Sequence, residues 1–170
     1  MARLPLLLYP NPRLREVSEP LTWDWTKQEG FQERLKDLKE TLVWYRGVGM
    51  SAIQAGWPVR LFVMRTAKEI QTFVNPRILE TDGDLTEMDE GCLSVPGVVE
   101  RVMRYPSVII ESMDMDTGMF DRWDLEGIEA QCAQHEIDHL DGKMFTDGYG
   151  GVKRDIAKRK IKKFLREESR

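Results

Sequence analysis

The fold is decided by one segment, Ile128-Glu129-Ala130-Gln131-Cys132-Ala133-Gln134-His135-Glu136-Ile137-Asp138-His139-Leu140. This segment carries both histidines of the chain. Its apolar Ala133, Ile137 and Leu140 recur at spacings of four and three, which is typical of one helix face. Gly142 is suited to end such a helix. Residues four apart on a helix differ by about 40° in azimuth and about 6 Å along the axis. The segment therefore predicts a helix whose two imidazoles can face one metal ion.

The pattern around the two histidines is HExxH, in which the glutamate serves as a general base. Glu136 could accept a proton from a metal-bound water. A third protein ligand is still needed, and Cys92, within Glu90-Gly91-Cys92-Leu93-Ser94, offers a thiolate. Cys132 lies three residues before His135 and could compete as a ligand, although we expect it to pack in the core. The alternatives are two ordinary helix histidines and a small buried Cys92.

Length and composition bound the class of protein. With 170 residues and 41% hydrophobic content, the chain suits one domain with a sizeable core, and collagen-like or disordered classes are excluded. The run Leu4 to Tyr9 is far shorter than the roughly 20 residues that span a bilayer. The turn-rich Pro10-Asn11-Pro12 that follows is unlike a signal peptide. We expect a cytoplasmic protein with a single domain over residues 1–170 and no membrane contact. An organellar precursor is less consistent with this amino terminus.

Short elements flank the histidine segment. Phe31, Leu35, Leu38 and Leu42 follow helical spacing. Residues 61–64, 72–75 and 108–112 are β-prone runs, and turn formers stand at 82–84 and 116–118. These elements predict an α+β protein with antiparallel sheets around a central helix that carries HExxH, and with a C-terminal helix.

The C-terminal helix is expected at about residues 153–168 and is strongly basic. Between Lys153 and Arg166 it has eight Lys or Arg and one Asp, whereas residues 1–152 carry a net charge of −10. Ile156, Lys160 and Phe164 recur at fours with Ile161 and Leu165 alongside, so one apolar stripe runs through an amphipathic helix. Such a tail could bind a polyanion, and a helix face that is merely solvated is the alternative.

Three motifs, in this order and spacing, resemble those of peptide deformylases: Gly47-Val48-Gly49-Met50-Ser51-Ala52-Ile53-Gln54, Glu90-Gly91-Cys92-Leu93-Ser94 and His135 to Gly142. The opening Tyr9 to Arg15 and the later Val74-Asn75-Pro76 are also similar to that family. The resemblance runs from about residue 6 to residue 147. It implies a metal-dependent hydrolase that removes the formyl group from the N-terminal formylmethionine of nascent polypeptides and releases formate.

The resemblance also implies roles for single residues. Cys92, His135 and His139 would bind one divalent metal ion, usually Fe²⁺ in this family, with Zn²⁺, Ni²⁺ or Co²⁺ as other occupants. Glu136 would be the general base. The side-chain amide of Gln54 and the backbone N–H of Leu93 would donate to the developing oxyanion.

The substrate contacts that the resemblance implies lie near Val48, Gly49, Ile128 and Cys132. Gly47 and Gly49 would let the substrate backbone lie close as an added strand, or they merely end the preceding helix. Arg104 matches an arginine near the bound peptide, and an exposed surface arginine is the alternative.

Three positions depart from the usual family pattern. Met50-Ser51 replaces a common Leu-Ala, which leaves the chemistry intact. Gln131 stands where an apolar residue is frequent, so a changed substrate preference is expected if it borders the pocket.

The implied partners are N-formylmethionyl peptides and, through the basic helix, the ribosome, with a monomer as the default state. Two other functions remain open. HExxH alone permits a protease that cleaves internal peptide bonds, and a catalytically silent metal-stabilised module could bind ribosomes or RNA. Cys92 and Gln54 favour the deformylase over the protease, and Glu136 favours an enzyme over the silent module.

Overall fold

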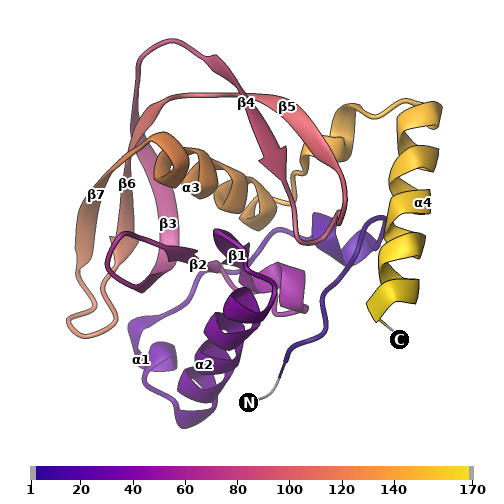
Figure 1. Ribbon diagram of the computed structural model, residues 1–170. Coiled ribbons are helices and arrows are strands. Elements are labelled where there is room, and N and C mark those ends of the chain that lie inside the picture. Colours follow the sequence, from indigo (N-terminus) through magenta and orange to yellow (C-terminus); the bar gives the residue numbers. More distant parts are fainter. Residues whose placement is uncertain (1–2, 169–170) are drawn as a thin grey trace.

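The computed structural model describes residues 3–168, which form helices and antiparallel strands (Figure 1). The helices are α1 (Trp23–Thr26), α2 (Glu29–Trp44), α3 (Gly127–Leu140) and α4 (Gly151–Glu168), with short 3₁₀ turns η1 (Pro12–Arg15), η2 (Ala52–Ala55) and η3 (Phe145–Gly148). The strands are β1 (Gly49–Ser51), β2 (Leu61–Arg65), β3 (Ile70–Asp82), β4 (Thr86–Gly91), β5 (Val99–Arg104), β6 (Ser107–Met113) and β7 (Phe120–Glu126).

The strands form two antiparallel sheets. One has five strands in the order β1-β2-β3-β6-β7, and the other pairs β4 with β5. Helix α3 lies between the two sheets, and α4 stands beside the β4–β5 hairpin (Figure 1). The predicted α+β class, the central helix and the C-terminal helix are confirmed. The predicted single domain includes residues 1–2 and 169–170, which lie outside the described range.

Strand β2 explains why a helix covers each face of the larger sheet. Successive side chains on a strand point to opposite faces, and its first four residues are all buried. Phe62 and Met64 pack with α3, whereas Leu61 and Val63 pack with α2. A strand that is buried on both faces is a continuous apolar run, and this run made β2 easy to recognise in the sequence.

A third apolar cluster joins the chain termini to the loop after β4. It contains Tyr9 and Leu14 from the amino-terminal arm, Cys92 from the loop, and Ala157 and Ile161 from α4. Both α4 residues are buried. The basic helix therefore packs on the body of the protein, close to Cys92, through Ala157 and Ile161. The expected apolar stripe is buried only in part, because Ile156 and Leu165 are exposed.

The sequence did not predict β4, β5 or β7. Strand β4, Thr-Glu-Met-Asp-Glu-Gly, is exposed except at Met88 and Glu90, so it lacks the apolar alternation by which strands are recognised. Pairing with β5 defines it instead, and Glu87 lies opposite Met103 in that register. Among the described residues, no helix has the length and apolar character needed to cross a bilayer.

Candidate metal centre and cavity

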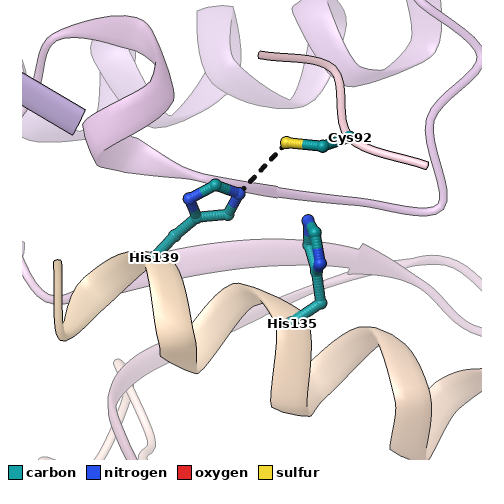
Figure 2. A group of neighbouring side chains, drawn as sticks. All are labelled: Cys92, His135 and His139. Carbon is teal, nitrogen blue, oxygen red and sulfur yellow. Dashed lines mark hydrogen bonds between the residues drawn. The ribbon is translucent and has the colours of Figure 1, made fainter. Parts of the chain in front are cut away.

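Three side chains converge where α3 passes the loop after β4 (Figure 2). His135 and His139 project from successive turns of α3, and Cys92 directly follows β4. Their candidate ligand atoms all lie within 4.8 Å of one another, and Cys92 Sγ is 3.2 Å from His139 Nε2. Ligands at about 2.0–2.3 Å from a tetrahedral ion would be separated by about 3–4 Å. One thiolate and two imidazoles at these distances fit a divalent metal ion.

Glu90 fixes the orientation of His135. Its Oε2 lies 2.9 Å from His135 Nδ1. Burial acts to raise the pKa of Glu90, but hydrogen bonds from His135 and Arg104 outweigh burial and lower the pKa to about 2. An ionised carboxylate only accepts hydrogen bonds, so Nδ1 donates, and Nε2 is the nitrogen left for a metal ion. Figure 2 shows the other ring nitrogen of His135 turned toward Cys92.

The two histidines differ in their protonation. Burial favours a neutral ring at both, and it lowers the pKa of His139 well below its ordinary value, with the neighbouring charge of His135 adding to the effect. At His135, hydrogen bonds with Cys92 and Glu90, together with charge from Cys92 and Glu136, overcome burial and raise the pKa. A cation at the same point would displace that proton, as metal ligation requires.

Arg104 is buried, so the alternative of an exposed surface arginine is wrong, whereas its contact with the peptide stays a prediction. It is only 9% exposed, and its Nε donates to Glu90 Oε1 at 2.7 Å. Its other arm donates to Asp138 Oδ2 at 2.6 Å. The guanidinium therefore ties β5 to β4 and to α3 behind His135. It acts on the site through Glu90, and it is absent from the lining of the cavity described below.

Glu136 is buried beside the three candidate ligands, at 3% exposure. Burial raises its pKa to about 7, although charge from His135 and hydrogen bonds with Ser51 oppose the rise. Its Oε2 atom has no hydrogen-bond partner among the described residues. A carboxylate with this pKa and a free oxygen can accept and return a proton near neutral pH.

Gln54 reaches the same point from the turn η2. Its Oε1 accepts from Ser51 N at 2.9 Å, which fixes the side-chain amide. The amide nitrogen then lies 3.5 Å from Cys92 Sγ and 3.2 Å from Ser94 Oγ. Leu93, next to Cys92, lines the cavity on the same side. The structure thus brings Gln54 and Leu93 beside the candidate metal ligands.

A cavity of about 570 Å³ opens from this centre to the surface. Near the centre it is lined by Val48, Ile128, Gln131 and Cys132, all of which the sequence placed around the substrate or singled out as a departure. Gln131 donates its Nε2 hydrogen to the backbone oxygen of Asp89 at 2.8 Å. The cavity belongs to the size class of small-ligand sites.

Gly49 is required by close packing. A Cβ at this position would lie 2.3 Å from Cys132 Sγ and 2.9 Å from Glu136 Oε1. Helix α2 ends at Trp44, and the backbone N–H of Gly47 donates to Leu42 O at 3.1 Å, so Gly47 takes part in the end of the helix whereas Gly49 lies beyond it. Cys132 itself packs in the core cluster of α3, as expected, and burial raises the pKa of its thiol well above the ordinary value.

The sequence did not identify the supporting roles of Glu90 and Asp138, or the contribution of Phe164 to the cavity. Glu90 lies inside a quoted motif and Asp138 lies between the two histidines, so both carried a positional signal. Phe164 is 25 residues beyond His139, and nothing in the sequence indicated that it lines the cavity.

Comparisons with known proteins agree on one family. The family model described as polypeptide deformylase matches residues 3–155. A peptide deformylase of Hyphomonas neptunium is 40% identical, covering 96% of this chain and 94% of that protein, and one of Mesorhizobium japonicum is 37% identical, covering 97% and 94%. The crystal structure of a peptide deformylase from Legionella pneumophila has a TM-score of 0.87 and 38% identity, covering 99% of both chains. A peptide deformylase from Ehrlichia chaffeensis in complex with actinonin has a TM-score of 0.84 and 29% identity, covering 96% and 98%.

Proposed function

This chain belongs to the peptide deformylase family, and from that premise we propose how its own residues perform the reaction. It is a metal-dependent hydrolase that removes the N-formyl group from the N-terminal formylmethionine of nascent polypeptides and releases formate. The observation that carries the proposal is the convergence of Cys92, His135 and His139 beside the buried carboxylate of Glu136.

Cys92, His135 and His139 hold the metal ion, and we assign Fe²⁺ as the physiological ion, with Zn²⁺, Ni²⁺ and Co²⁺ able to replace it. Sulfur and imidazole ligands suit these ions. The bound ion would supply Lewis acidity toward the formyl oxygen and lower the pKa of water. Glu90 keeps His135 in the ligating tautomer, and Arg104 keeps Glu90 ionised.

Glu136 moves the proton. As the attacking water bonds to the formyl carbon, the free Oε2 of Glu136 takes one of its protons. When the bond between the formyl carbon and the methionine nitrogen breaks, Glu136 returns that proton to the nitrogen. The products are formate and a free amino terminus, and the carboxylate is restored.

Two donors stabilise the negative charge that develops on the formyl oxygen. These are the side-chain amide of Gln54, held in place by Ser51, and the backbone N–H of Leu93. Because the donors are already oriented, they do not need to rearrange during the reaction. Removal of one such donor typically costs about 2.7–4 kcal/mol of barrier.

The methionine side chain occupies the apolar part of the cavity near Val48, Ile128 and Cys132. Gly49 lines the same cavity, and its lack of a side chain lets β1 pack closely against Cys132. Gln131 is the polar member of this group, and its amide is held by Asp89.

Formate release tests the proposed roles. Anaerobically purified, Fe²⁺-loaded protein is incubated with formyl-Met-Ala-Ser, and metal content is determined on the same sample. We expect turnover in the wild type, whereas Glu136→Ala retains the metal but loses at least about 100-fold in kcat. Turnover that survives Glu136→Ala would contradict the role of Glu136. No release from a fully metallated wild type would instead favour the silent module.

An unformylated peptide of the same sequence separates this activity from proteolysis. A protease that cleaves internal bonds would cut both peptides. A deformylase releases formate only from the formylated one.

We further propose that the protein is a cytoplasmic monomer that meets the ribosome through α4. Several cations of α4 are exposed, among them Lys158, Arg159 and Lys162. Such side chains can contact RNA phosphates, which would make binding sensitive to salt. Because α4 packs through Ala157 and Ile161, substitution of exposed cations is a cleaner test than deletion of the helix.

The triple variant Lys158→Glu, Arg159→Glu, Lys162→Glu is expected to lose ribosome co-sedimentation at low salt while it still deformylates formyl-Met-Ala-Ser. Unchanged co-sedimentation would remove this part of the proposal. Light scattering at several protein concentrations tests the monomer.

A further inference from the structure

Helix α4 is fixed against the active-site loop by contacts on three successive turns. Lys153 Nζ lies 2.8 Å from Glu100 Oε2 on β5. Ala157 and Ile161 are buried in the same cluster as Cys92. A Cβ on Gly97 would lie 3.9 Å from Lys160 Cβ, which is ordinary van der Waals contact. Because residues three and four apart share a helix face, these contacts turn Phe164 toward the same side.

Phe164 lines the cavity that contains Cys92, His135 and Glu136. Its side chain is half-buried. It also lines a second hollow of about 360 Å³, which is bordered by the first part of the amino-terminal arm, within residues 3–8. Tyr45 is the other residue shared by the two hollows. The active-site cavity and the groove along the arm therefore meet at these two aromatic rings.

The lining of the active-site cavity is of two kinds. Cys92, His135 and Glu136 contribute polar and ionisable groups, and the methionine site is proposed near Val48. Tyr45, Pro96, Gly97 and Phe164 contribute apolar and aromatic surface, which we call the outer end because Tyr45 and Phe164 also border the second hollow. The rest of the cavity is called the inner end. Once the formyl group and the methionine side chain occupy the inner end, the outer end is left for the residues that follow.

We propose that Phe164 of α4, together with Tyr45, forms the binding site for the peptide residues after the formylmethionine and favours apolar side chains there. This inference rests on the proposed function. Aromatic rings contribute a large contact area at low entropic cost, which suits a surface that must hold varied apolar side chains. Phe164 is thus a specificity-determining residue, and α4 is part of the substrate site as well as a basic surface.

Steady-state kinetics with three formylated substrates tests the proposal on the metal-loaded enzyme. The substrates are formyl-Met amide, formyl-Met-Gly-Gly amide and formyl-Met-Leu-Leu amide. The wild type is expected to have the lowest KM for the Leu-Leu peptide. In Phe164→Ala, the ratio of kcat/KM for the Leu-Leu peptide to that for formyl-Met amide is expected to fall about three- to tenfold, mainly through KM.

Two further variants separate substrate contact from helix packing. Phe164→Tyr keeps the ring and should keep the ratio. Ile156→Ala is the matched control, because Ile156 is an exposed apolar residue of α4 that lines neither hollow and should leave both activity and ratio unchanged. If Phe164→Ala unfolds, Phe164→Gln gives the same comparison, with a loss of the ratio expected.

The outcomes are distinct from those that test the reaction itself. An unchanged ratio in Phe164→Ala, or an equal loss with all three substrates, would overturn the substrate site on α4. If the metallated wild type releases formate from none of the three, the proposed function fails instead.

Discussion

His135 Nδ1 lies 2.9 Å from Oε2 of Glu90, so a carboxylate on β4 sets the orientation of a histidine on α3. The two residues are 45 positions apart in the chain and share a buried environment. This contact leaves one nitrogen of His135 available for ligation. It also connects the metal centre to the smaller sheet, whose other residues are mostly exposed.

Removing the Glu90 carboxylate should therefore weaken metal binding while all three candidate ligands remain. Loss of such a ligand-orienting partner typically lowers metal affinity 10- to 100-fold. We expect this loss in Glu90→Ala, measured by competition with a chelator at fixed pH. Glu87→Ala is the control on the same strand, because Glu87 makes only an exposed pair with Arg101. Equal metal affinity in the two variants would show that Glu90 does not orient the ligand.

Arg104 should matter for stability more than for peptide binding. Without it, Glu90 and Asp138 would lose the cation that pairs with both of them, and breaking a buried pair in this way costs about 3–5 kcal/mol. We expect this decrease in the free energy of unfolding of Arg104→Ala in urea. Arg101→Ala, which breaks pairs at the surface, should cost no more than about 1 kcal/mol. If Arg104→Ala raises the KM for the formylated peptide and leaves the stability unchanged, Arg104 instead contacts the peptide.

The contact between β1 and α3 can be tested from both sides. Gly49→Ala places a methyl group 2.3 Å from Cys132 Sγ, and overpacking of this kind costs about 1–3 kcal/mol of unfolding free energy. Cys132→Ala removes the sulfur atom, so the double variant should recover part of that loss in urea denaturation. Full additivity of the two single effects would show that they do not interact. Recovery should be incomplete, because the new methyl group also approaches Glu136 Oε1.

The ligand pair on α3 could be predicted from the sequence because helical spacing alone brings His135 and His139 together. The strand β2 could be predicted equally directly, because its burial on both faces requires the apolar run that the sequence has at residues 61–64. The β4–β5 hairpin had no such signal, since its apolar and polar residues do not alternate and its strands are defined by pairing with each other. For the same reason the sequence could not show that Arg104 turns inward to Glu90, because β5 has no alternation to indicate the direction of a side chain.

The position of Phe164 illustrates a second limit. The amphipathic pattern of the C-terminal segment predicted a helix, and α4 confirms it. A pattern on one helix does not reveal which surface the apolar stripe covers. That depends on the loop from Cys92 to Val98, which meets α4 only in the folded protein. The contact between the basic helix and the cavity therefore emerged from the structure.

Gln131 should broaden the range of first side chains that the cavity accepts. One hydrogen of its Nε2 is donated to Asp89 O, and a primary amide has a second that can serve a polar substrate group. A sulfoxide oxygen on an oxidised methionine is such an acceptor. We expect Gln131→Leu to lower the kcat/KM ratio of formyl-methionine-sulfoxide peptide to formyl-Met peptide about fivefold, the equivalent of one neutral hydrogen bond. Glu129→Gln is the control, since Glu129 is only half-buried on the same helix and does not line the cavity. If Gln131→Leu leaves the ratio at the wild-type value, the amide makes no contact with the first side chain, and the polar residue at this position serves only to hold Asp89.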